Sequence, residues 1–131
     1  MPNSPEIVIQ ISALIRGLWF PSETEAPWTI PTWTLRTTEA SDIRRSLHRA
    51  DGVAIHEITL DDLMNQVDKR CQGYGDEGKA IAQQHHTLAR YLKHHCQAVR
   101  VFRVGNITVD ILLVGETPED TILLQTQSVE T

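Results

Sequence analysis

The sequence predicts a single α+β domain over residues 1–131. Apolar residues recur at helical spacing in four segments between residues 4 and 96, whereas residues 99–129 consist of β-rich runs separated by turn signals. With 131 residues, 40% of them hydrophobic and 22% charged, the chain is long enough to bury one core and has an ordinary globular composition. We therefore expect three or four helices that cover a sheet of about four or five strands.

Helices are predicted over residues 4–17, 39–49, 59–67 and 79–96. Ser4 is a suitable N-cap for the first helix, Pro5 fits its first position, and Gly17 ends it. The third helix opens with a capping-box pattern, T-L-D-D at residues 59–62, with Asp in place of the usual Glu. Glycines at positions 73, 75 and 78 predict a loop before the fourth helix.

Strands are predicted over residues 28–36, 53–58, 99–104, 107–114 and 121–129. The first of them contains Pro31, which restricts it to a sheet edge or marks a bulge because proline has no N–H to donate. Gly105-Asn106 predicts a tight turn between the third and fourth strands. Residues 116–120 predict a second turn before the last strand.

The negative charge of the chain is concentrated in two segments. The net charge is −5, and residues 17–35 and 104–131 together hold seven acidic side chains and no Lys or Arg. A surface of that sign repels nucleic acid and attracts basic clefts, so we expect no direct nucleic-acid binding. The alternative interpretation is that these acidic segments only keep the protein soluble.

The sequence also bears on location and redox state. The apolar stretch of residues 7–18 is interrupted by Gln10, Ser12 and Arg16, which predicts neither a signal peptide nor a membrane span. We therefore expect a cytoplasmic protein without membrane contact. Cys71 and Cys96 lie 25 residues apart with no C-x-x-C, and we expect both thiols to be reduced and structural.

Patterns typical of enzymes are weak. Two histidine pairs, at 85–86 and 94–95, lie on the last predicted helix beside Cys96, but no two histidines have the four-residue spacing of a helical metal site. We expect these histidines to be exposed or half-buried. The serines lack a G-x-S-x-G setting, and the Gly73-Tyr74-Gly75 run is followed by acids rather than by G-K-[ST]. We therefore expect no enzyme activity and no cofactor, and a small enzyme with an unrecognised site is the least favoured hypothesis.

Two stretches of the sequence carry a family resemblance. Residues 17–27, G-L-W-F-P-S-E-T-E-A-P, fit the pattern G-L-x-F-x-S-E-S/T-E-x-P, with Trp33 further along in register. The second stretch comprises V-F-R-V-G at 101–105, V-D at 109–110, V-G-E-T-P at 114–118 and the final V-E-T at 129–131. With these motifs the chain resembles the cyanobacterial nuclease A inhibitor family. The resemblance is weak over residues 36–70.

This resemblance implies a fold, a partner and a site. The fold is a three-layer α/β/α sandwich around a central, largely antiparallel sheet, similar to that of the pathogenesis-related plant proteins. The partner is a secreted, sugar-nonspecific ββα-metal endonuclease, which an inhibitor that we expect to be monomeric blocks. Thr131 is implied to reach the catalytic Mg²⁺ of that nuclease, and Glu23 to dock beside it. The partner-binding residues that we expect are Glu23, Thr24, Glu25, Tyr74, Asp76, Glu77, Glu130 and Thr131.

The sequence departs from the family pattern just before the last predicted helix. The family has an acid and a tryptophan where this chain has Gln72 and Gly73, while Tyr74, Asp76 and Glu77 remain in register. Loss of an aromatic anchor weakens an interface. The alternative function is therefore a non-catalytic binding or scaffold module that keeps this fold for a different protein partner.

Overall fold

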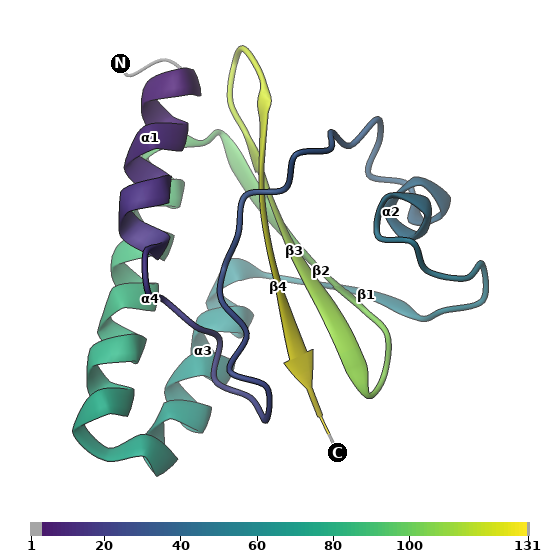
Figure 1. Cartoon of the computed structure of the whole chain (residues 1–131). Coiled ribbons are helices and arrows are strands. Elements are labelled where there is room, and N and C mark those ends of the chain that lie inside the picture. The colour runs from purple at the N-terminus through teal and green to yellow at the C-terminus, as the bar shows by residue number, and fades with distance from the viewer. Residues whose placement is uncertain (1–3, 131) are drawn as a thin grey trace.

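A computed structural model describes residues 4–130 of the chain (Figure 1). Thr131, the predicted metal-binding residue, lies outside the described residues. The elements in order are α1 (Ser4–Ile15), α2 (Ala40–Ser46), β1 (Ile55–Ile58), α3 (Leu60–Cys71), a 3-10 turn η1 (Gln72–Tyr74), α4 (Gly75–His95), β2 (Ala98–Val104), β3 (Thr108–Glu116) and β4 (Thr121–Val129).

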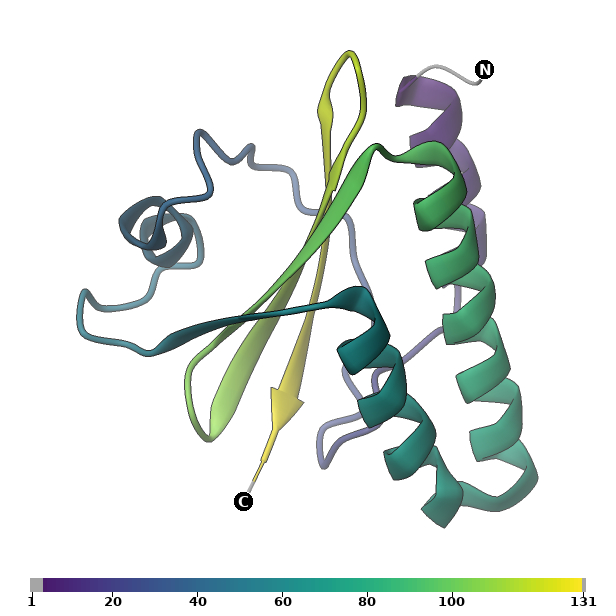
Figure 2. The same cartoon turned by 180° about the vertical axis from the view of Figure 1, so that it is seen from behind.

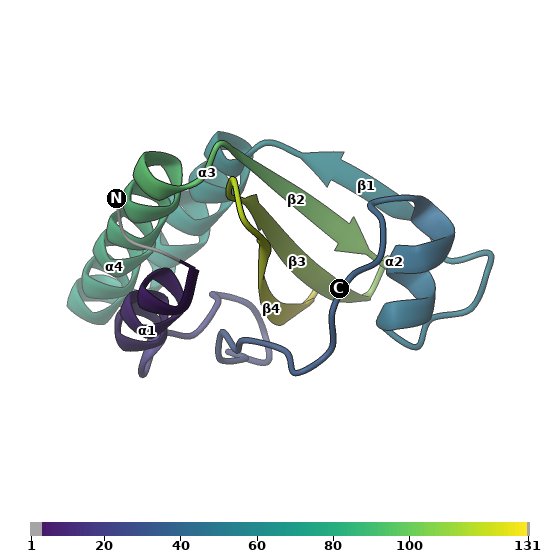
Figure 3. The ribbon, with the colours of Figure 1, turned by 90° about the horizontal axis from the view of Figure 1, so that it is seen from above.

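The strands form one antiparallel sheet in the order β1-β2-β3-β4. Alternate residues of each strand point to opposite faces, so Val101 and Ile111 join one apolar cluster and Phe102 and Leu112 join another. Helices α1, α3 and α4 cover the first face, and α2 covers the second with the segment before it (Figure 3). These three layers confirm the predicted α+β sandwich.

The helical hairpin of α3 and α4 supports the larger core. Figure 2 shows β1 leading into α3, and α3 and α4 lying side by side. The capping box is confirmed, because Thr59 Oγ1 accepts a hydrogen bond from the backbone N–H of Asp62 at 3.0 Å and the Asp62 carboxylate accepts one from Thr59 N–H at 3.4 Å.

The prediction of a loop at the glycines 73, 75 and 78 is wrong from Gly75 onward, because α4 already begins there. Gly75 adopts a positive φ of 63° where η1 turns into α4. A Cβ on Gly78 would lie 2.1 Å from the carbonyl oxygen of Cys71. Gly78 therefore permits close contact between the two helices and does not break α4.

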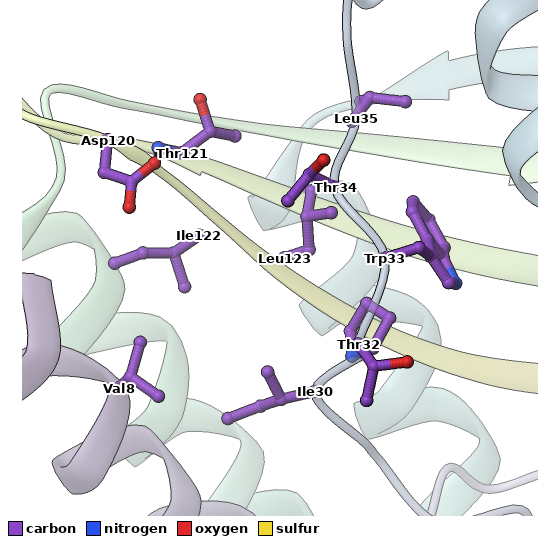
Figure 4. A pocket seen from close by; sticks show the side chains of 11 residues that line it. Val8, Ile30, Thr32, Trp33, Thr34, Leu35, Asp120, Thr121, Ile122 and Leu123 are labelled. Atoms are coloured by element: carbon purple, nitrogen blue, oxygen red, sulfur yellow. Dashed lines mark hydrogen bonds between the residues drawn. The ribbon is translucent and has the colours of Figure 1, made fainter.

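The strand predicted over residues 28–36 is also wrong, because only Thr29 pairs with the sheet. Its N–H and carbonyl both bond Gln125 of β4, at 2.8 Å each. Continuing that antiparallel register places Pro31 opposite Leu123, where proline has no N–H to donate. The segment leaves the strand there, and a hollow of about 240 Å³ lies between residues 30–35, the start of β4 and Val8 of α1 (Figure 4).

One histidine differs from the prediction that all of them are exposed or half-buried. His85 is completely buried, its Nε2 accepts a hydrogen bond from Trp28 Nε1–H at 2.9 Å, and its Nδ1 lies 2.9 Å from the Ile81 carbonyl oxygen. Burial lowers the pKa of His85 to about 4, although the Ile81 carbonyl partly opposes this. Neutral His85 thus ties the chain at Trp28 to α4. Cys71 and Cys96 are buried free thiols, and burial raises the pKa of both.

Candidate partner-binding surface

The acidic motif forms the tip of a narrow loop between α1 and the sheet. The loop is closed at its base by the bridge between Trp19 and Pro27 and by a hydrogen bond from Phe20 N–H to the Ala26 carbonyl at 2.8 Å. The side chains of Phe20 and Trp28 are buried beneath it. The base of this loop is therefore anchored in the core while its tip projects from the surface.

The tip itself, residues 22–25, presents the predicted acids to solvent. Glu23, Thr24 and Glu25 are all exposed. Glu25 N–H bonds the Ser22 carbonyl at 3.3 Å, and Glu25 has a positive φ of 47°, which is uncommon for a residue with a Cβ. Ser22 Oγ lies 3.2 Å from Thr24 Oγ1 and accepts from Thr24 N–H at 3.4 Å. These local bonds fix the turn that carries Glu23.

The end of β4 lies against this loop. The backbone N–H of Val129 donates to Ser22 Oγ at 3.3 Å. Arg70 of α3 joins the two segments, because its Nη1 donates to the Pro21 carbonyl at 3.3 Å and to Ser128 Oγ at 3.0 Å. The loop and the last strand are therefore positioned by a common arginine.

Glu130 is held by two arginines from different elements. Its carboxylate accepts from Arg70 Nη2 at 2.8 Å and from Arg103 Nη2 at 2.5 Å, and it also accepts from Ser128 Oγ at 2.8 Å. Burial alone would raise the pKa of Glu130, but these hydrogen bonds outweigh it and lower that pKa to about 2. Arg103 Nη1 donates a second hydrogen bond, to Gln66 Oε1, at 2.9 Å. The last described residue is thus ionised and fixed.

The turn between α3 and α4 contributes the remaining predicted residues. Tyr74 OH donates to the Ser22 carbonyl at 3.5 Å, and the Tyr74 ring meets the Trp19 ring edge-on at 5.2 Å. Asp76 and Glu77 follow in the exposed first turn of α4, where a helix N-terminus favours negative charge. In Figure 1 this turn, the acidic loop and the end of β4 lie at the lower end of the molecule.

Sequence reasoning found the exposed residues of this surface but missed those that hold it together. Arg70 had no recognisable local signal, because its partners are 49 to 60 residues away along the chain. Arg103 and Ser22 lie inside the family motifs, yet the motifs do not indicate that their side chains form hydrogen bonds with residues at the end of β4. The described residues, 4–130, contain no group of three or more His, Cys, Asp or Glu side chains that could hold a metal ion.

The acidic loop, the end of β4 and the turn between α3 and α4 are thus joined by side-chain contacts on one part of the α+β sandwich. Residues 5–131 match the family described as nuclease A inhibitor-like protein. The chain therefore belongs to the nuclease A inhibitor-like family, whose members are inhibitors. No curated protein matches the chain. Within residues 4–130, no helix is both long and apolar enough to cross a membrane.

Proposed function

We propose that the protein inhibits a sugar-nonspecific, Mg²⁺-dependent endonuclease of the ββα-metal class by occupying its active site. Family membership supports a nuclease as the partner. The observation that carries the proposal is the convergence of the acidic loop and the end of β4 through Arg70. This convergence directs two family motifs that are about 100 residues apart toward the same partner.

Thr131 is the proposed ligand to the Mg²⁺ of the nuclease. Mg²⁺ is a hard cation that accepts hydroxyl and carboxylate oxygens, and the side chain of threonine offers a hydroxyl. Glu130 has a different role in this proposal, because Arg70 and Arg103 already neutralise its carboxylate. Glu130 fixes the end of β4, directly before the proposed ligand in the sequence.

The exposed acids supply electrostatic complementarity. Glu23 and Glu25 project from the loop, and Asp76 and Glu77 from the start of α4. A cleft that holds a polyanionic substrate is basic, so these four carboxylates accelerate encounter and favour the correct docking orientation. Their contribution falls as salt rises, because exposed charges are screened.

The test is digestion of plasmid DNA by a purified ββα-metal nuclease titrated with the protein, and stoichiometric loss of cleavage is the expected result. Deleting Thr131 should raise the inhibition constant at least 100-fold, on the order of a hot-spot loss. The pair Glu23→Gln/Glu25→Gln should weaken inhibition mainly at low salt. Its matched control is Glu39→Gln/Glu119→Gln, which removes two exposed charges elsewhere. Equal inhibition by all of these proteins would refute the active-site plug.

A second candidate is a binding module for a different protein partner. It is favoured by Gln72 and Gly73, both exposed on η1, at the positions where the family pattern has an acid and a tryptophan. In this case a micromolar excess of the protein leaves DNA cleavage by ββα-metal nucleases unchanged. Affinity capture would then recover a partner that is not a nuclease.

A further inference from the structure

The turn between β2 and β3, residues 105–107, lies beside the end of β4. The backbone N–H of Glu130 donates to the carbonyl oxygen of Ile107 at 2.8 Å. The Ile107 side chain is 62% exposed. Among the described residues only one other large hydrophobic side chain is comparably exposed, that of Ile9 on α1, at 70%. Ile107 is thus a solvent-exposed isoleucine directly beside Glu130.

Polar contacts from Arg49 and Asp110 fix this turn. Arg49, from the segment between α2 and β1, donates to the Thr108 carbonyl at 3.0 Å and to the Asp110 carboxylate at 2.9 Å. Asp110 is 3% exposed and also accepts from Gln127 Nε2 at 3.0 Å. Gly105 N–H bonds the Ala54 carbonyl at 2.9 Å. Gly105 has a φ of 114°, and a Cβ there would lie 2.3 Å from Arg49 Nη2.

These contacts explain the V-D motif that the proposed function did not use. The buried Asp110 holds Arg49, and Arg49 holds the backbone immediately after Ile107. A turn that is already fixed before binding loses little conformational entropy when a partner covers it. An exposed aliphatic side chain on a fixed turn, beside a charged anchor, excludes water from the neighbouring polar contacts once a partner covers it, as the surroundings of an interface hot spot do.

We infer that Ile107 is an apolar anchor of the nuclease-binding surface and that residues 105–107 form a third contact segment beside the acidic loop and the end of β4. The inference rests on the proposed function. The nuclease surface that it predicts is an apolar contact at the margin of the basic, metal-containing cleft. The occupant is the same nuclease that Thr131 enters, so the two contacts act in one complex.

The experiment compares Ile107→Thr with Ile9→Thr in the DNA-cleavage titration, using the full chain. Both variants make the same chemical change at an exposed isoleucine. Ile9 belongs to α1, and Figure 1 shows that helix apart from the end of β4. Ile107→Thr should weaken inhibition ~10-fold or more through faster dissociation, with the salt dependence of binding unchanged because no charge is altered. Ile9→Thr should inhibit like the unaltered protein.

Thermal unfolding of both variants separates binding from folding, and Ile107→Leu, which keeps an apolar side chain, should restore most of the inhibition. Equal inhibition by Ile107→Thr, Ile9→Thr and the unaltered protein would overturn the inference and leave the proposed function standing. Failure of the unaltered protein to inhibit would instead overturn the proposed function and this inference with it. Loss of inhibition in Ile107→Thr together with a lowered unfolding midpoint, not rescued by Ile107→Leu, would assign Ile107 a structural role and also overturn the inference.

Discussion

The two ends of β4 are stabilised in opposite ways. At its start, residues 117–120 form a turn held by local bonds, in which Thr117 Oγ1 accepts from the N–H groups of Glu119 at 3.3 Å and Asp120 at 3.0 Å. At its end, the hydrogen bonds join distant parts of the chain. Glu130 accepts a hydrogen bond from Arg70, which is 60 residues away in the sequence, and Val129 donates one to Ser22, which is 107 residues away.

This contrast shows which part of the molecule depends on the whole fold. The hydrogen bonds that hold the turn at 117–120 lie among its own residues. The candidate partner-binding surface exists only when α3, the acidic loop and the sheet are all docked. Changes that loosen this docking should therefore damage the surface before they damage the turn, and three predictions test that expectation in order of decreasing effect.

The largest effect is expected from acid acting on His85. Burial lowers the pKa of His85 from 6.5 to about 4, so below pH 6.5 the unfolded chain binds a proton that the folded protein does not. The contribution of His85 to stability is complete above pH 6.5, declines as the pH falls, and is lost by about pH 4. A shift of this size corresponds to about 3 kcal/mol.

Chemical denaturation between pH 7 and pH 4 measures this effect. His85→Gln should be less stable at pH 7, because the bond to the Trp28 indole is disturbed, and should show a smaller decline in that pH range. Parallel pH profiles for the two proteins would contradict the prediction. Because His85 holds Trp28 at the base of the acidic loop, inhibition should weaken over the same range if measured with an acid-tolerant nuclease.

The second prediction compares Glu130→Gln with Glu119→Gln. Glu130→Gln leaves Arg70 and Arg103 close together without a carboxylate, and it should lower the free energy of unfolding by about 2 kcal/mol. Glu119 is exposed at the other end of β4, so its replacement should change stability by less than about 0.5 kcal/mol. Denaturation at pH 7 gives both values, and similar losses in the two variants would remove the contrast between the ends.

The pH dependence sharpens this comparison. The pKa of Glu130 is depressed from 4.5 to about 2, so its stabilising contribution is complete above pH 4.5 and is lost as the pH falls toward 2. The unaltered protein should therefore lose stability in that range faster than Glu130→Gln. Identical slopes below pH 4.5 would mean that the two arginines do not act on Glu130 in solution.

The same contrast explains what could be predicted from the sequence. The turn at 116–120, the capping box at Thr59 and the strands after residue 98 were predicted correctly because their signals are local. The strand at 28–36 was predicted wrongly, since pairing with β4 ends where Pro31 meets Leu123. The exposed residues of the surface came from family motifs. Arg70 and the burial of His85 depend on contacts between distant segments, and no spacing in the sequence encodes these.

The smallest expected effect concerns the glycines of the α3–α4 turn. Alanine at an internal helix position normally stabilises by up to about 1 kcal/mol relative to glycine. At Gly78 the new Cβ would lie 2.1 Å from the Cys71 carbonyl and 2.8 Å from the Tyr74 Cβ, so the helices must separate, at a cost of about 1–3 kcal/mol. The clash exceeds the gain in helix propensity, and Gly78→Ala should destabilise by about 1 kcal/mol. It should also displace Tyr74 from the Ser22 carbonyl.

Gly73→Ala is the matched control, because no atom lies within 4 Å of its added Cβ, and it should leave both stability and inhibition unchanged. If Gly78→Ala proved as stable as Gly73→Ala, the close packing of α3 on α4 would not be needed to form the surface.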